Sequence, residues 1–185
     1  MNLSASPLQQ LDLSFYGIDN LVYIKRDDLI HNVISGNKWR KLKYNLQYFQ
    51  SISKHGIVSM GGAFSSHILA LSYICNEYKI PCTLLVRGEP SLPVNNILKQ
   101  CLSFNARIKY INREKYKDSL WINALVNESF KDFYFIPEGG ANYFGIYGCQ
   151  KIVKEIMMPF DVIFCEVGTG ATFSGIVSSL SSEQR

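Results

Sequence analysis

The sequence has little that marks a secreted, metal-binding or membrane protein. It has five cysteines in 185 residues, none of them in a Cys-x-x-Cys pair. Most lie in apolar runs, which is typical of free thiols in a reducing compartment and not of disulfides or zinc ligands. The start of the chain lacks the features of a signal peptide, and no stretch approaches the ~18 apolar residues of a membrane span. We therefore expect a cytoplasmic protein with no metal and no membrane partner.

The sequence also lacks a strong excess of charge of either sign. The chain has 19 Lys and Arg against 15 Asp and Glu, a formal net charge of +4. Basic residues gather in one segment only, at Lys38, Arg40, Lys41 and Lys43. Such a segment raises nucleic-acid binding as an alternative. Because the aromatic residues of the same segment are spaced like core residues, we expect no nucleic-acid partner.

Apolar runs and apolar stripes alternate along the chain, and 47% of the residues are hydrophobic, enough for a sizeable core. Runs predict strands at 21–24, 56–60, 82–86, 107–111, 134–136 and 162–165. Stripes predict helices opening at 38, over 65–78, around 94–101, over 118–130, over 145–157 and from 173. This alternation indicates an α/β fold in three layers with mainly parallel sheets. Ligands of such sheets bind beyond the carboxyl ends of strands, so the informative loops are 61–67, 137–142 and 167–172.

The stretch 35–42 reads Ser-Gly-Asn-Lys-Trp-Arg-Lys-Leu and opens a predicted helix. Asn37 fits the N-cap position, which puts Lys38 in the first turn. The positive end of the helix dipole disfavours an ammonium there and helps to make a neutral amine available. A neutral, positioned amine is what reaction with an aldehyde requires. The alternative is that Lys38 is an ordinary solvated cation.

The loop at 168–172 reads Gly-Thr-Gly-Ala-Thr between an apolar run and a helix. Its glycines let backbone N–H groups surround an anion, and the threonine hydroxyls donate as well. We interpret it as a phosphate-binding loop, although it matches neither the Walker pattern nor Gly-x-Gly-x-x-Gly. The alternative is an ordinary glycine-containing turn.

The loop at 61–67 ends in Ser65, Ser66 and His67 at the start of a helix. These groups suit a carboxylate or a ring hydroxyl, while a capping or packing role is the alternative for His67. The loop at 137–142 is interpreted as structural, a hinge or part of a pocket wall. A lysine, a phosphate loop and a hydroxyl-rich loop together indicate pyridoxal phosphate, which needs an amine, an anion site and contacts to its ring.

At these residues the chain resembles the 1-aminocyclopropane-1-carboxylate deaminase and D-cysteine desulfhydrase family. The resemblance lies in Lys-Arg-Asp-Asp-Leu at 25–29, in Ser-Gly-Asn-Lys-x-Arg-Lys-Leu at 35–42 and in the order of the three loops. It implies a two-domain pyridoxal-phosphate enzyme of the tryptophan-synthase-β type, fold type II. The large domain would comprise 1–42 and 146–185, and the small inserted domain 43–145.

The resemblance also implies roles for individual residues. Lys38 would hold pyridoxal 5'-phosphate as a Schiff base and move the proton of the substrate α-carbon. Ser65 would be catalytic and face the substrate carboxylate, next to Ser66 and His67 as substrate contacts. The cofactor would be bound by Lys38, Ser66, Gly168, Thr169, Gly170, Ala171 and Thr172.

Three departures from the family pattern stand out. Ser66 replaces an asparagine that contacts the cofactor ring oxygen, which puts that contact in doubt. Ala171 replaces a glycine, and alanine would be strained if the position required a positive φ. The chain also ends just after the phosphate loop, where family members continue, so the resemblance implies that the C-terminal part of the large domain is missing. We expect the 185-residue chain alone to be inactive.

The predicted function is a pyridoxal-phosphate-dependent deaminase or desulfhydrase. Its substrate would be a small amino acid of the 1-aminocyclopropane-1-carboxylate or D-cysteine type, and the complete enzyme would be a homodimer. Two alternatives stay open: a serine/threonine-dehydratase-like lyase, and a degenerate non-catalytic homologue that binds phosphate or a partner.

Overall fold

The computed structural model describes residues 3–90 and 93–185, and its centre is a four-stranded parallel sheet. The strands are β3 (Gly56–Gly62), β4 (Cys82–Arg87), β5 (Arg107–Ile111) and β6 (Phe133–Ile136), in the order β5-β4-β3-β6. Four of the predicted strands are thus confirmed, and so is their parallel arrangement. The central strands β3 and β4 have nearly continuous apolar sequences because both of their faces are buried, whereas the edge strand β5 alternates between exposed and partly buried residues.

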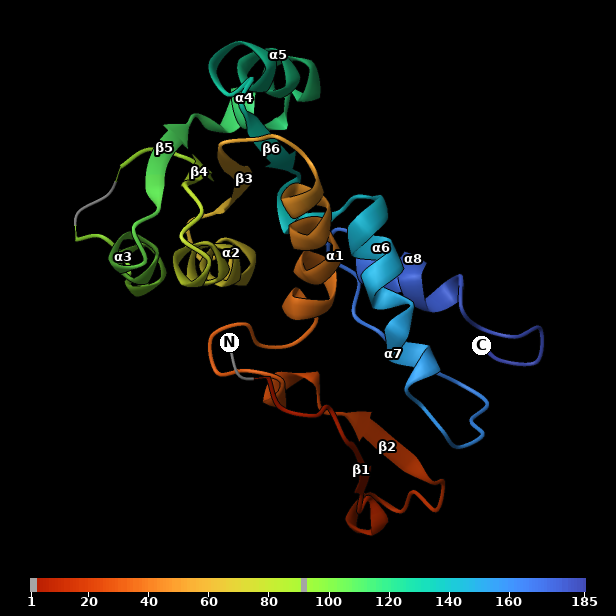
Figure 1. Cartoon of the computed structure of the whole chain (residues 1–185). Coiled ribbons are helices and arrows are strands. Elements are labelled where there is room, and N and C mark those ends of the chain that lie inside the picture. Colours follow the sequence, from red (N-terminus) through yellow and green to blue (C-terminus); the bar gives the residue numbers. More distant parts are fainter. Residues whose placement is uncertain (1–2, 91–92) are drawn as a thin grey trace.

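Helices cover both faces of this sheet, which gives the three predicted layers (Figure 1). On one face α2 (Ser66–Glu77) and α3 (Asn96–Ser103) pack over Ile57, Leu84 and Val86. On the other face α4 (Arg113–Lys117) and α5 (Ser119–Ser129) pack over Val58, Met60 and Leu85. Side chains of one strand therefore alternate between two cores, as the pleat requires.

A second group of helices flanks the sheet and contains α1 (Lys38–Ser51), α6 (Tyr143–Cys149), α7 (Lys151–Lys154) and α8 (Ala171–Val177). The α1 and α6 helices touch at Gly148, where an added Cβ would lie 1.8 Å from the carbonyl oxygen of Arg40. The helix predicted over 145–157 is found as two consecutive short helices, α6 and α7, separated at Gln150, which keeps helical backbone angles and donates to Ile146; the second helix ends at Lys154, three residues earlier than predicted. Among the described residues, no helix has the length and apolar character to cross a bilayer.

The N-terminal segment forms a separate antiparallel hairpin of β1 (Leu8–Leu11) and β2 (Val22–Lys25). Two short 3₁₀ turns belong to it: η1 (Ser14–Tyr16) between the strands, and η2 (Asp27–Leu29) after them. The strand predicted at 21–24 is confirmed with a shift of one residue, but its neighbour is the unpredicted β1. The sequence of β1 is Leu-Gln-Gln-Leu, which lacks the alternation that marks a half-buried strand.

The strand predicted at 162–165 is wrong. This segment has no strand partner among the described residues, and its ties to the C-terminal end are two backbone hydrogen bonds between Arg185 and residues 161 and 163. Phe164 is 94% exposed. An apolar run becomes a strand only where a neighbouring strand accepts its hydrogen bonds, and no such neighbour is placed here. The division into domains of 1–42 with 146–185 and 43–145 stays a prediction; residues 1–2 and 91–92 lie outside the described residues.

Candidate functional site

A cavity of about 490 Å³ lies at the carboxyl ends of β3 and β6. It brings together the first turn of α1, the loop entering α2, η3 (Glu138–Gly140) and the loop before α8. Three predicted glycine loops and Lys38 thus converge in space. The lining residues are Asn37, Lys38, Lys41, Ser65, His67, Glu138, Gly139, Glu166, Val167, Gly168, Thr169, Gly170, Thr172 and Phe173. A second cavity, of about 410 Å³, lies at the opposite edge of the sheet and includes none of the predicted site residues.

Lys38 begins α1 and its amine lies in this cavity. Lys38 Nζ donates a hydrogen bond to Asn37 Oδ1 at 2.5 Å. Burial lowers the pKa of Lys38 below its ordinary value, and the nearby charge of Lys41 lowers it further, while Glu166 and Cys149 act in the opposite direction. The amine is therefore easier to deprotonate than that of a solvated lysine.

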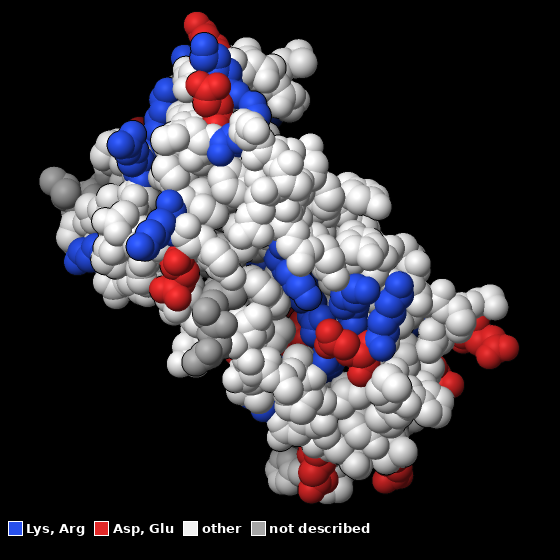
Figure 2. All heavy atoms as spheres, in the orientation of Figure 1, with Lys and Arg blue, Asp and Glu red and all other residues white. Residues whose placement is uncertain are grey.

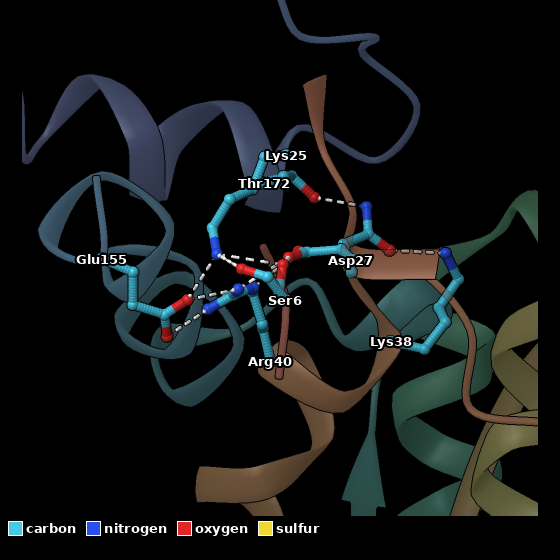
Figure 3. Close-up of polar contacts among 8 residues, drawn as sticks. Ser6, Lys25, Asp27, Lys38, Arg40, Glu155 and Thr172 are labelled. Carbon is cyan, nitrogen blue, oxygen red and sulfur yellow. Dashed lines mark hydrogen bonds and ion pairs between the residues drawn. The ribbon is translucent and has the colours of Figure 1, made fainter. Parts of the chain in front are cut away.

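Asn37 occupies the predicted N-cap position, but its side chain makes no capping hydrogen bond. Asn37 Nδ2 instead donates to Thr172 Oγ1 at 2.8 Å, across 135 positions of sequence. Figure 3 shows Lys38 and Thr172 on the two sides of this connection. The predicted N-cap position is therefore confirmed, but the side-chain oxygen of Asn37 accepts from Lys38 Nζ and not from a backbone N–H of the helix.

Lys41 is a site residue that the sequence alone did not single out. Its side chain is 5% exposed and lines the cavity one turn after Lys38. Among the described residues no carboxylate lies within 4.0 Å of its amine, and no side-chain hydrogen bond reaches it. Burial lowers its pKa. An amine that lines a cavity on a largely buried side chain, without a protein partner among the described residues, indicates a position where a bound anion supplies the missing charge. The i, i+3 spacing from Lys38 was the available signal.

The two glycine loops at 137–142 and 168–172 lie against each other. Gly139 has φ +65°, and a Cβ on it would lie 2.8 Å from Thr169 Cγ2, so only glycine fits. Gly170 has φ +83° and precedes α8. Ala171 is the first residue of α8, is buried and has no positive φ, so the condition under which this alanine would be strained is not met. The positive φ falls on Gly170 instead. Ala171 is not among the residues that line the cavity.

Two of the three polar residues of the hydroxyl-rich loop line the cavity, and the third does not. Ser65 lines the cavity and caps α2, its Oγ accepting a hydrogen bond from the backbone N–H of His67 at 3.2 Å. Ser66 is exposed and does not line the cavity. His67 is 1% exposed and forms part of the cavity wall.

His67 is held in one neutral form by its hydrogen bonds. Ser59 Oγ donates to the carbonyl oxygen of Ile136 at 2.7 Å, so it accepts a proton from His67 Nε2 at 2.9 Å. His67 Nδ1 is then unprotonated, and it is buried without a hydrogen-bond partner. Burial, together with the charges of Lys38 and Lys41, lowers the pKa of His67 to about 3. The cavity wall therefore contributes no third positive charge.

The opposite side of α1 carries a network of ion pairs centred on Arg40, which is 5% exposed. Arg40 forms two hydrogen bonds to Asp27, both at 2.6 Å, and two to Glu155, at 2.9 and 2.8 Å. Lys25 adds an ion pair to Glu155 at 2.9 Å. Figure 3 shows this cluster pointing away from Lys38. The Lys-Arg-Asp-Asp-Leu segment thus anchors the lysine helix from behind.

The basic residues of α1 do not form one stripe facing solvent. Arg40 and Lys41 are buried, and acidic partners are interleaved with basic ones. Figure 2 shows side chains of both signs gathered in a hollow over α1, α6 and α7. The basic residues of α1 are thus divided between the cavity wall, where Lys41 lies, and the ion pairs of Arg40 that hold the helix.

Comparison with known proteins identifies the family. The sequence profile described as "Pyridoxal-phosphate dependent enzyme" matches residues 2–185. The chain belongs to this family. Pyridoxal 5'-phosphate is the cofactor of these enzymes, and the α/β architecture is that of their fold type II.

Relatives within the pyridoxal-phosphate family are named as deaminases and desulfhydrases. A provisionally named 1-aminocyclopropane-1-carboxylate deaminase of Thermotoga maritima is 33% identical over 98% of this chain and 61% of its own length. A bifunctional D-cysteine desulfhydrase/1-aminocyclopropane-1-carboxylate deaminase of Arabidopsis thaliana is 30% identical over 84% of this chain and 44% of its own. The chain therefore spans about three-fifths or less of these relatives.

Solved structures of the family agree with the fold. A crystal structure titled as an ACC deaminase homologue superposes with a TM-score of 0.80 at 28% identity, over 97% of this chain and 57% of that one. The O-acetylserine dependent cystathionine β-synthase of Helicobacter pylori superposes with a TM-score of 0.74 at 16% identity, which shows the fold alone.

Proposed function

We propose that this chain carries the Schiff-base lysine, Lys38, of a pyridoxal-phosphate-dependent deaminase or desulfhydrase acting on a small amino acid. The substrate class is that of 1-aminocyclopropane-1-carboxylate or D-cysteine, as the names of its relatives suggest. The observation that carries the proposal is the Lys38 amine, which has a lowered pKa and faces a cavity bounded by the Gly-Thr-Gly loop. A Schiff base forms when such an amine and an aldehyde join with loss of one water.

The residues of the cavity fit this cofactor. A phosphate would be held by the loop residues Gly168, Thr169, Gly170 and Thr172, with Lys41 supplying the charge. Lys41 is the most informative of these, because its side chain is largely buried and its amine has no anionic partner among the described residues. Thr172 accepts its hydrogen bond from Asn37, so that bond does not use the proton of its hydroxyl. Ala171 contributes to the start of α8 and not to the cavity wall.

The remaining groups of the cavity suit a small amino acid. When bound, pyridoxal phosphate supplies a ring that stabilises negative charge at the substrate α-carbon. Lys38 would take or return the α-proton of a substrate of the D-cysteine type; 1-aminocyclopropane-1-carboxylate has no hydrogen on its α-carbon, so with that substrate Lys38 would move a proton of a neighbouring ring carbon. Ser65 would donate to the substrate carboxylate from the start of α2, and neutral His67 would close the wall beside it. Ser66 would have to turn inward to contact the cofactor, since it is exposed in this structure.

Reductive trapping tests the assignment of Lys38. The protein is incubated with pyridoxal 5'-phosphate, reduced with borohydride, and the modified peptide is mapped by mass spectrometry. We expect the adduct at Lys38 and none there in Lys38→Arg. Lys43→Arg is the matched control, because Lys43 lies on the same helix beside Tyr44 and outside the cavity lining; it should leave the adduct at Lys38 unchanged. An adduct at another lysine, with Lys38 unmodified, contradicts the proposal.

A substrate panel tests the reaction. Ammonia, oxo acid and sulfide are measured with 1-aminocyclopropane-1-carboxylate, D-cysteine, L-serine and L-threonine. The assay uses a protein of the relatives' length. The proposal expects turnover of 1-aminocyclopropane-1-carboxylate or of D-cysteine. Turnover of L-serine or L-threonine alone would instead favour the dehydratase-like lyase. Trapping at Lys38 without turnover of any amino acid would favour a non-catalytic homologue.

Two further expectations belong with this proposal. The complete enzyme would be a homodimer, which sedimentation measures directly. A reducing, cytoplasmic location is supported by five free cysteines, four of them buried; fractionation of cells that express the protein tests it.

A further inference from the structure

Asn37 connects the reactive lysine to the first turn of α8. Its Oδ1 accepts from Lys38 Nζ at 2.5 Å, and its Nδ2 donates to Thr172 Oγ1 at 2.8 Å. Lys38 and Asn37 are half-buried and Thr172 is buried, so water does not readily replace these bonds. Three side chains that all line the cavity thus form one chain of hydrogen bonds.

The chemistry of the three groups fixes the orientation of the amide. An ammonium has donors and no acceptor, so only the oxygen of Asn37 suits Lys38. The nitrogen must then face Thr172, whose hydroxyl oxygen accepts. The opposite orientation would set two donors against each other at Lys38. Thr172 therefore holds the amide with its oxygen toward the lysine.

We propose that Asn37 is a positioning residue that holds the Lys38 amine beside the 168–172 loop, with Thr172 fixing the orientation of its amide. The inference rests on the proposed function in that Lys38 is the reactive amine. It assigns Asn37 a task that its N-cap position alone does not explain. It also makes Asn37 a group that favours the charged form of Lys38, because an amide oxygen accepts best from an ammonium.

Other charged and titratable groups also face Lys38, from every element around it. Lys41 lies one turn along α1, Cys149 is on α6, and His67 is on α2. Glu166 lies in the loop before α8 and Glu138 in η3. All of these stay constant when Asn37 is changed, so differences among variants at this position report the Asn37 contact itself.

Two substitutions of Asn37 that should shift the pKa of Lys38 in opposite directions distinguish a positioning role from a structural one. Lys38 labelling by acetic anhydride is measured across pH and mapped by peptide, with Lys43 as internal reference. Asn37→Asp places a carboxylate beside the ammonium, so we expect the pKa of Lys38 to rise by about 1–3 units and labelling below that pKa to fall about tenfold or more. Asn37→Ala removes the acceptor, so we expect the pKa to fall and labelling to rise. Thr172→Val should shift labelling in the direction of Asn37→Ala, and Thr172→Ser should restore it.

A purely structural role predicts a different result. If Asn37→Asp and Asn37→Ala move the titration of Lys38 in the same direction, or leave it unchanged, the inference is wrong. Circular dichroism identifies any variant that fails to fold, and Thr172→Val tests the same connection from its other end. The outcome is independent of the trapping experiment. Opposite shifts without a cofactor adduct would contradict the proposed function alone, and an adduct without opposite shifts would contradict this inference alone.

Discussion

The basic residues on the two sides of α1 differ in whether a carboxylate neutralises their charge. On the rear side, Arg40 meets two carboxylates through four hydrogen bonds, and these partners raise its pKa against the effect of burial. On the cavity side, Lys38 is half-buried and Lys41 is buried, and neither has a carboxylate within 4.0 Å among the described residues; burial lowers the pKa of both. All three residues lie within four positions of one helix.

This difference separates anchoring from reactivity. A guanidinium with two carboxylates is fixed and chemically inert, and it ties the helix to the N-terminal segment and to the end of α7. An amine without a carboxylate is costly to protonate and can react or receive an anion. The ion pairs of Arg40 therefore hold α1 in position. The amines of Lys38 and Lys41 are not needed for this and have no carboxylate partner among the described residues.

Removing Arg40 should have the largest effect on stability. Arg40→Met leaves Asp27 and Glu155 without their central partner, so we expect the free energy of unfolding to fall by about 3 kcal/mol. Urea titration measures it. Lys43→Met is the control on the same helix, where a change of less than about 1 kcal/mol is expected. Equal stability of Arg40→Met and the parent protein would show that the network does not anchor α1.

Protonation of His67 should have the next largest effect. Its folded pKa of about 3 lies below the ordinary 6.5, so the unfolded chain binds this proton first as the pH falls. Stability contributed by neutral His67 is present above 6.5 and is lost from there toward 3. Between pH 6.5 and pH 5 the loss should be about 1.5 kcal/mol. His67→Gln keeps a donor for Ser59 and should lose this part of the pH dependence; an unchanged profile would contradict burial of a neutral imidazole.

Lys41 should respond in the opposite direction from Arg40. Lys41→Met removes a buried amine that has no carboxylate partner, so we expect stability to rise by about 1 kcal/mol. The same change should weaken binding of pyridoxal 5'-phosphate, which absorbance titration measures. A loss of stability comparable with that of Arg40→Met would mean that Lys41 is paired after all, and the contrast between the two sides of α1 would fail.

Glu155 should give the smallest effect. Its hydrogen bonds to Arg40 lower its pKa from 4.5 to about 2, so its contribution is present above 4.5 and is lost as the pH falls toward 2. The side chain is 46% exposed, so salt should screen the effect. Glu155→Gln should flatten this acid limb of the stability curve, more at low salt than at high salt. An acid limb identical to that of the parent would assign the loss to other carboxyl groups.

The sequence predicted those features that depend on local pattern and sheet geometry. The central strands follow from apolar runs, and the convergence of the loops after β3 and β6 follows from the common edge at which parallel strands end. The third loop, at 168–172, follows no strand of this sheet, so its position does not come from that rule. Whether residues 162–165 form a strand could not be judged from their own sequence, because a strand forms only where a neighbouring strand pairs with it through hydrogen bonds. The bridge from Asn37 to Thr172 and the pair of Arg40 with Glu155 join residues 135 and 115 positions apart. Such contacts depend on tertiary packing, so no local sequence pattern indicates either of them.

The central claim is that the cavity side of α1 presents Lys38 as an amine of lowered proton affinity. The most direct measurement is the pKa of Lys38 in the cofactor-free protein, from peptide-resolved labelling across pH. The structure predicts a pKa below the ordinary lysine value of 10.5, because burial and Lys41 both disfavour the ammonium. A pKa at or above 10.5 in the folded protein would contradict the account.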